Sequence, residues 1–145
     1  MRPFFMHRFE EVALALFRVV AGLMFMQHGA RKLFGWLKAP NAPPGTAELF
    51  SQMGVAGVLE FFGGLLIVLG LFTRPVAFLL SGQMAAAYFM AHAPNGPVPI
   101  LNGGELSVLF CFIFLYLSAR GGGRYSVDHA MAGRDTANGP RTARV

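Results

Sequence analysis

An apolar stretch that contains polar side chains, Val12 to Trp36, most constrains the fold of this chain. A helix rises about 1.5 Å per residue, so about 20 residues cover the roughly 30 Å hydrocarbon core of a bilayer. Arg18, Gln27 and His28 lie inside the stretch. A charge at the bilayer centre costs on the order of 3 kcal/mol on insertion scales. Arg18 should therefore face other helices and find its partner further along the chain.

The same stretch predicts a helix with one face of small and polar residues. At 100° per residue five positions share this face, His28 lies at its edge, and Gln27 lies nearly opposite. Small residues let a neighbouring backbone approach while long polar side chains reach across. Arg18 could be a structural anchor or a functional site, whereas Lys32 is expected to snorkel to the head groups. The five positions are Arg18, Gly22, Phe25, Gly29 and Lys32.

The composition is that of a membrane protein. Of the 145 residues, 54% are hydrophobic and only 13% are charged, far from the usual soluble chain. The net charge of +5 does not predict nucleic-acid binding, because the basic residues stand at the ends of apolar runs and near the C-terminus rather than in a stripe. We expect the lipid bilayer, and no nucleic acid, as a partner.

Four apolar segments predict four membrane-spanning helices in an all-α bundle. The spans are expected at about 12–36, 54–72, 76–92 and 105–119.

The segments outside these spans complete the expected architecture. Thr46 can cap a short helix that ends at Met53 and lies at the membrane interface, within the first outer loop. Residues 1–128 would form the four-helix membrane domain. Residues 129–145 would form a flexible basic tail.

The distribution of basic residues predicts the orientation. Eight of them lie near the termini or in the Arg74 turn, against three around the first loop and none in the second loop, residues 93–104. Basic residues favour the cytoplasmic side. We therefore expect a multi-pass protein of the plasma (inner) membrane with both termini in the cytoplasm.

Ionisable residues from all four predicted helices fall at similar depth. Glu60 lies about six residues, roughly 9 Å, below the outer end of its helix, at the level of Gln27 and His28. His92 ends the third span and Glu105 begins the fourth on the same side. We expect His28, Glu60, His92 and Glu105 to form one polar cluster, in which Glu60 pairs with His28 or Gln27.

Such a cluster has several chemical interpretations. It could handle protons at a quinone head group, since a quinone needs hydrogen-bond partners and a proton route. A haem or metal ion is less favoured, because neither histidine belongs to a helical ligand pair. The residues could also be a polar bolt between helices, and Glu105 could simply cap its helix. The single cysteine, Cys111, excludes a dithiol shuttle within the chain, and the sequence identifies no catalytic residue.

Five motifs, in this order and at these spacings, resemble the DoxX family of small four-helix membrane proteins. The match runs from about Leu14 to Asp128. The motifs are RVVAGLMFMQHGARKLFGW, LEFFGGLLIVLGLFTRPVA, His92 near the end of the third span, NGGE at 102–105 and GRYSVD at 123–128.

The resemblance implies a redox setting. The family takes its name from a small membrane subunit of a thiosulfate:quinone oxidoreductase, and other members are associated with oxidant and thiol stress in bacteria, as membrane partners of redox proteins. The family's recurring polar positions correspond here to Arg18, Lys32, Glu60, Arg74, His92 and Glu105, and His28 also fits.

Three functions stay open. The first is a membrane subunit of a redox or oxidative-stress system that interacts with quinone or soluble redox partners; any enzymatic activity would be that of a quinone-linked oxidoreductase subunit that needs a partner. The second is a non-enzymatic scaffold that recruits soluble proteins through its tail or loops. The third and least favoured is a small transporter, for which one four-helix protomer leaves little cavity unless a second copy forms a homo-oligomer.

Overall fold

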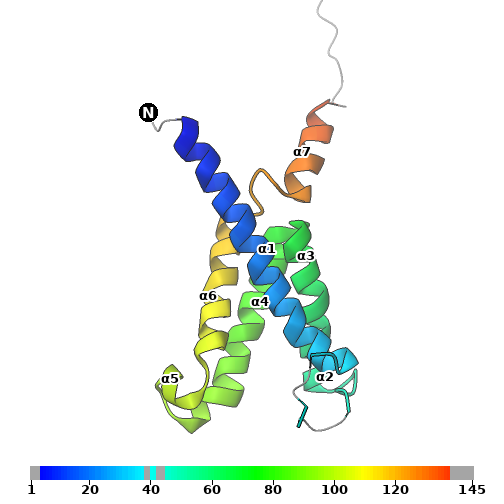
Figure 1. Cartoon of the computed structure of the whole chain (residues 1–145), viewed down its shortest axis with the longest axis vertical. Helices are drawn as coiled ribbons and strands as arrows, with labels where there is room; N and C mark the ends of the chain where they lie inside the picture. The colour runs from blue at the N-terminus through cyan, green and yellow to red at the C-terminus, as the bar shows by residue number, and fades with distance from the viewer. Residues whose placement is uncertain (1–3, 38–39, 42–44, 138–145) are drawn as a thin grey trace, which may run out of the picture.

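The computed structural model describes residues 4–37, 40–41 and 45–137. Within them the secondary structure is helical, without strands, so the prediction of an all-α protein is confirmed. Four long rods run between two ends of the molecule (Figure 1). The elements are α1 (Phe4–Phe34); α2 (Gln52–Val58), η1 (Leu59–Gly63) and α3 (Gly64–Leu69); α4 (Thr73–Ala87), η2 (Tyr88–His92) and η3 (Ala93–Asn95); α5 (Pro99–Asn102); α6 (Glu105–Arg120); and α7 (Val127–Ala137).

The rods have a terminal end and a loop end. The terminal end carries the start of α1, the α3–α4 turn and α7, and the loop end carries the two longer connections and α5 (Figure 1). The segments η1 and η2 are π-helical turns, which continue the rods of α2–α3 and α4.

Glycines set the packing of α1, which lies on the rod formed by α2, η1 and α3. The other two rods, α4 and α6, pack on each other. A Cβ atom on Gly29 would lie 2.4 Å from the backbone nitrogen of Phe61, and one on Gly22 would lie 2.8 Å from the carbonyl oxygen of Gly64. Only residues without a Cβ atom allow backbones to approach so closely. The small-residue face of the first predicted span is therefore a helix-packing face.

A phenylalanine cluster joins the two halves of the bundle. Phe25 of α1 is 1% exposed, and its ring centroid lies 4.8 Å from that of Phe114 and 5.2 Å from that of Phe110, both on α6. Edge-on and tilted ring contacts of this kind are favourable beyond their buried area. The other buried members of this core are Leu14, Ile67, Ala77, Leu80, Met84 and Leu117.

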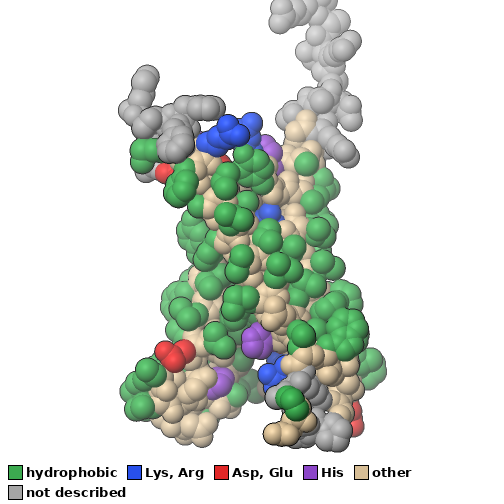
Figure 2. All heavy atoms as spheres, viewed as in Figure 1, with side chains coloured by type: hydrophobic (Ala, Val, Ile, Leu, Met, Phe, Trp, Pro, Cys, Tyr) green, Lys and Arg blue, Asp and Glu red, His purple; other side chains and the backbone are tan. Residues whose placement is uncertain are grey.

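Two of the four predicted spans meet the length and hydropathy of a membrane helix: 18 residues over Gln52–Leu69 and 23 residues over Thr73–Asn95. The rod α6 has only 16 residues, about 24 Å, and α1 has 31 residues with charged side chains in its first third, middle and last turn. Apolar side chains cover the middle of the visible face, whereas most charged side chains lie towards the ends (Figure 2).

The predicted interfacial helix from Thr46 to Met53 is wrong. Residues 45–50 are not helical, and the helix begins at Gln52. Ser51 is the reason, because its Oγ accepts a hydrogen bond from the backbone N–H of Gly54 at 3.1 Å and so caps α2. The one-turn helix α5 lies in the second loop.

Residues 129–137, the first part of the predicted flexible tail of residues 129–145, are helical and belong to α7. Ser126 starts this helix: its Oγ accepts from the backbone N–H of His129 at 3.2 Å, and its carbonyl oxygen accepts from Ala130. Hydrogen bonds of this kind satisfy the free donors of a helix start. Residues 138–145 lie outside the described residues.

Candidate functional site

Glu60 is a buried carboxylate at the contact of three rods. It lies on η1 with a side chain that is 3% exposed, and its Oε1 accepts a hydrogen bond from Lys32 Nζ of α1 at 2.5 Å. Gln83 Nε2 of α4 lies 3.3 Å from the same oxygen and 3.3 Å from the carbonyl oxygen of Ala56. We call Lys32, Glu60 and Gln83 the Glu60 site.

Two predictions about this region are wrong: Glu60 pairs with neither His28 nor Gln27, and Lys32 does not snorkel away from the bundle. Lys32 follows Gly29 by three residues on the face of α1 that packs on η1, so its side chain reaches across the close crossing to Glu60. Gln27 is exposed on α1. The glycine contact therefore selects the lysine as the partner.

The Glu60 site has unused hydrogen-bonding capacity. Among the described residues, Glu60 Oε2 and Gln83 Oε1 are buried without a partner. The amide orientation of Gln83 follows from its surroundings, because the nitrogen faces two acceptors. Lysine has three donor hydrogens, and one serves Glu60. Buried polar groups without partners are uncommon in proteins, and these two oxygens can each accept a further hydrogen bond.

A cavity of about 450 Å³ at the loop end borders this site. Its lining includes His28, Arg31 and Lys32, so the lysine that holds Glu60 also faces the cavity. The ring of His28 packs edge-on against Phe110 of α6, with centroids 6.2 Å apart. We call this space the loop-end cavity; Lys32 joins it to the buried carboxylate.

His92 makes its contacts elsewhere. Its Nδ1 lies 3.2 Å from the carbonyl oxygen of Asn102, to which it can donate, and its ring stacks on Tyr88 at 6.4 Å. The amide of Asn102 orders the second loop by donating to Gly96 O at 2.7 Å and accepting from Gly104 N at 2.8 Å. His92 is therefore part of the structure that closes this loop.

The four residues of the predicted cluster thus have different surroundings. Glu60 contacts α1 and α4, His28 packs on α6, His92 contacts the second loop, and Glu105 is exposed in the first turn of α6. Within the described residues no group of three or more His, Cys, Asp or Glu side chains is placed to hold a metal ion. Glu60 and His28 stay candidates through their links with Lys32.

Both Glu60 and His92 lie in π-helical turns, over Leu59–Gly63 and Tyr88–His92. Such turns are rare and often mark functional sites, because they rotate side chains out of α-helical register. The hydropathy pattern carries no sign of them. The sequence therefore located these two residues but not the backbone geometry that directs them.

Arg18 is buried at the terminal end and bonds three backbone carbonyls, as expected of a structural anchor. It is 2% exposed, and its Nη1 donates to the carbonyl oxygens of Ile67 at 2.6 Å and Val68 at 2.7 Å. Its Nη2 donates to Tyr125 O at 2.8 Å. The last carbonyls of a helix have no partner within it, so Arg18 satisfies the end of α3 and fixes the loop after α6.

Sequence reasoning missed two carboxylates at this end. Asp128 accepts hydrogen bonds from the backbone N–H groups of Phe72 at 2.7 Å and Thr73 at 2.9 Å. It thereby caps α4 from a distant part of the chain, although α4 begins without a local side-chain cap. Glu11 accepts from Arg120 Nη2 at 2.6 Å and from the backbone N–H of Arg124 at 2.7 Å. The GRYSVD motif, which contains two of these partners, was the available signal.

These two carboxyl groups, which lie outside the predicted spans, have lowered pKa values. The backbone N–H of Arg124 and the guanidinium of Arg120 lower the pKa of Glu11. Burial raises the pKa of Asp128, but the backbone N–H groups of Thr73 and Phe72 and the charge of Arg18 outweigh it, so this pKa is also lowered. A lowered pKa in the folded state stabilises the protein above the unfolded-state value, about 4, and this contribution is lost as the pH falls further.

At a pH below about 4, we expect the unfolding temperature in detergent to fall, because Glu11 and Asp128 become protonated. The double variant Glu11→Gln/Asp128→Asn should be less stable at neutral pH and should lose less stability on acidification. Thermal scans from pH 7 to pH 3 check this, with Glu48→Gln as the control because Glu48 is exposed. Parallel curves for the wild type and the double variant would contradict the assignment.

The comparisons with known proteins agree on one family. The DoxX family model matches residues 13–93, more than half of the chain. A Haemophilus influenzae relative, named "Uncharacterized protein", is 39% identical over 130 residues, which cover 86% of this chain and 94% of the relative. "Inner membrane protein YqjF" of Escherichia coli is 27% identical over 87% of this chain and 97% of its own length.

A Bacillus subtilis relative, "Putative oxidoreductase CatD", is 25% identical over 85% of this chain and 90% of the relative. No solved structure matches the chain. The family match includes Arg18 and the Glu60 site, and the 39% identical relative covers 86% of the chain. The chain is therefore a membrane protein of the DoxX family.

Proposed function

We propose that this chain is the membrane subunit of a redox system, and that it interacts with a quinone and works with a separate redox protein. One observation supports this most directly: Lys32, 25% exposed, lines the loop-end cavity and pairs with the buried Glu60, while Glu60 Oε2 and Gln83 Oε1 are free. Ionisable residues inside membranes are costly and tend to mark proton or substrate pathways.

In this proposal all four rods cross the inner membrane, with the terminal end in the cytoplasm. The basic residues near both termini and in the Arg74 turn support this orientation. The short α6, about 24 Å, can be accommodated by local thinning of the bilayer at modest cost. The loop-end cavity then opens towards the outer face.

The Glu60 site can bind a quinone head group through Lys32. Lys32 lines the loop-end cavity and can donate a hydrogen bond to a quinone carbonyl. Glu60 and Gln83 do not line this cavity, and their free oxygens, Glu60 Oε2 and Gln83 Oε1, are buried behind Lys32. Reducing a quinone adds two electrons and two protons. The partner protein supplies the electrons, and Glu60 takes part in the proton transfer. The name of the Bacillus subtilis relative supports an oxidoreductase setting.

An apolar groove gives a place for an isoprenoid tail. It has a volume of about 380 Å³ and lies between α1 and α6, lined by side chains such as Val20, Met24 and Ile113. Phe110 lines this groove and also packs against His28, which lines the loop-end cavity. A tail in the groove would therefore bring its head group to His28 and Lys32.

We expect Glu60→Gln to lower the amount of quinone that copurifies with the protein in mild detergent by about tenfold, since a charged hydrogen bond contributes about 1.5 to 3 kcal/mol. Chromatography of extracted quinones and titration with decylubiquinone measure this. Glu105→Gln is the matched control, because Glu105 is an exposed carboxylate at the same end.

The single variant leaves Lys32 without its charged partner. Because Lys32 is 25% exposed, the cost should stay below the roughly 3 to 5 kcal/mol of a fully buried unpaired charge. Folded yield is therefore measured alongside. The double variant Lys32→Met/Glu60→Gln removes both charges and should fold. If it folds and keeps the quinone content of the wild type, the pair is only a polar bolt and the quinone proposal fails.

The second candidate is a non-enzymatic scaffold. It is favoured by the apolar tip of the first loop, where Phe50 is fully exposed, Leu49 is 61% exposed and Met53 is 56% exposed. An exposed apolar group at the edge of the membrane can bind a partner protein. Two results together would select this function: the wild type contains no quinone, and the Phe50→Ser variant loses a protein partner that copurifies with the wild type.

A further inference from the structure

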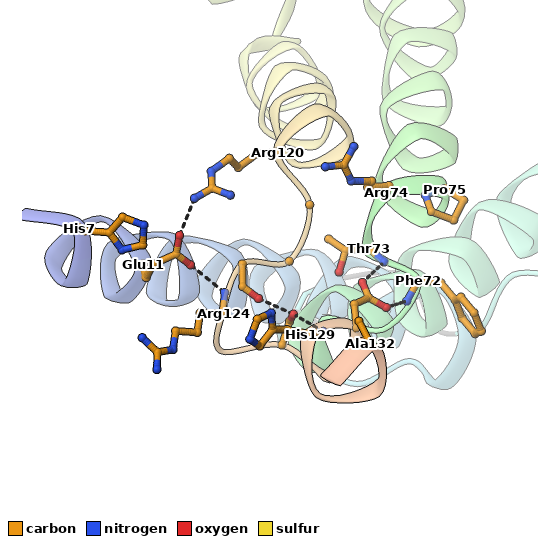
Figure 3. Close-up of a pocket in the computed structure, with 15 residues that line it drawn as sticks. His7, Glu11, Phe72, Thr73, Arg74, Pro75, Arg120, Arg124, His129 and Ala132 are labelled. Carbon is orange, nitrogen blue, oxygen red and sulfur yellow. Dashed lines mark hydrogen bonds and ion pairs between the residues drawn. The ribbon is translucent and has the colours of Figure 1, made fainter. Parts of the chain in front are cut away.

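A second, larger cavity of about 860 Å³ lies at the terminal end, far along the rods from the Glu60 site. The start of α1, the α3–α4 turn, the loop after α6 and α7 surround it (Figure 3). We call it the terminal-end cavity. Its lining includes two histidines and three arginines: His7, Arg74, Arg120, Arg124 and His129.

The acidic residues of this cavity are already engaged. Both oxygens of Glu11 accept hydrogen bonds, one from Arg120 and one from the backbone of Arg124. Both oxygens of Asp128 accept from the backbone of the α3–α4 turn, as the dashed lines in Figure 3 show. The carboxylates therefore hold the walls of the cavity together. They accept no hydrogen bond from the guanidinium groups of Arg74 and Arg124.

Two guanidinium groups keep their donors free. In the part of the chain that the structure describes, neither the Arg74 nor the Arg124 side chain has a hydrogen bond or an ion pair with a protein acceptor. Arg74 is nevertheless positioned, because a Cβ atom on Gly121 would lie 3.1 Å from its Nε. Figure 3 shows Arg74 and Arg120 extending from α4 and α6 on the same side of the cavity.

The chemistry of this cavity fits a phosphate group. A guanidinium presents donors in a planar fork that matches phosphate oxygens, and basic pockets between membrane helices on the cytoplasmic side suit anionic head groups. The cavity lies where the rods end and α7 begins, at the level expected for lipid head groups. We propose that the terminal-end cavity binds the phosphate of an anionic phospholipid, with Arg74 as its principal ligand and Arg120 and Arg124 beside it.

The test uses the full-length protein in detergent and native mass spectrometry. Phosphatidylglycerol is compared with phosphatidylcholine, with and without inorganic phosphate as a competitor. The wild type should retain phosphatidylglycerol in preference to phosphatidylcholine. Arg74→Gln should weaken phosphatidylglycerol binding about tenfold, as expected for the loss of one charged hydrogen-bonding group.

Arg8→Gln is the matched control, since Arg8 is an exposed arginine at the same end but does not line this cavity. It should change binding less than twofold. Arg74→Gln should fold, because Arg74 has no protein acceptor to lose, and its melting temperature checks this. Arg74→Lys keeps the positive charge but loses the planar set of guanidinium donors, and should bind phosphatidylglycerol with intermediate strength.

Two results would overturn the proposal: equal retention of both lipids, or equal weakening by Arg74→Gln and Arg8→Gln, which would indicate only diffuse attraction. Tighter binding of inorganic phosphate than of phosphatidylglycerol would also overturn it, because the site would then belong to a soluble phosphate compound. Quinone content is not affected by any of these outcomes, so this proposal and the quinone proposal fail independently.

Discussion

Replacing Arg18 with leucine should remove most of the folded protein. Arg18 donates three hydrogen bonds to backbone carbonyls, two at the end of α3 and one at Tyr125. Hydrogen bonds to a charged group contribute about 1.5 to 3 kcal/mol each, and the carbonyls left unpaired add a further cost. The sum is comparable with the whole stability of a typical domain, about 5 to 15 kcal/mol. We expect the monodisperse yield in detergent to fall at least tenfold.

The measurement is fluorescence-detected size exclusion of a tagged full chain, followed by thermal scans of any folded fraction. Arg31→Leu is the control, because Arg31 lies on the same helix and is exposed, where substitutions usually change stability by less than about 0.5 kcal/mol. Arg18→Lys keeps a charge with a smaller donor set and should give an intermediate yield. Equal yields of Arg18→Leu and Arg31→Leu would show that Arg18 is not an anchor.

The sequence predicted the rods well but the partners of their polar residues poorly. Hydropathy and helical spacing placed four helical rods, although α1 begins at Phe4 and not near residue 12. They also identified the face of α1 that carries Arg18, Gly22 and Gly29. Those signals are local, since they depend on residues three or four positions apart. They also showed that Arg18 needed a partner, without showing that the partners would be backbone carbonyls.

The errors arise where a contact joins distant segments. Depth along a helix suggested His28 or Gln27 for Glu60, but depth does not fix rotation about the helix axis, and the glycine crossing at Gly29 turns Lys32 towards the carboxylate. Likewise, no side chain near Thr73 in the sequence caps α4. The cap is the carboxylate of Asp128, which lies 55 residues away. Segment 129–137 looked flexible by composition, yet its start is fixed by Ser126.

The second large effect is expected at Gly29. An alanine Cβ atom there would meet the backbone nitrogen of Phe61 at 2.4 Å and the carbonyl oxygen of Gly57 at 2.7 Å. Both are backbone atoms, so no side chain can move aside, and α1 must separate from η1. Overpacking of a tight core costs about 1 to 3 kcal/mol and occasionally more. Because the obstacle is backbone, we expect Gly29→Ala to reach or exceed the upper value.

The separation would also move Lys32, three residues along α1, away from Glu60, so quinone content should fall together with the melting temperature if the Glu60 site binds a quinone. Gly82→Ala is the matched control, since a Cβ atom there has no neighbour within 4 Å and alanine favours a helix by about 1 kcal/mol over glycine. Thermal scans of both variants in one detergent compare them directly. A melting temperature of Gly29→Ala equal to that of Gly82→Ala would mean that α1 and η1 do not cross as closely as described.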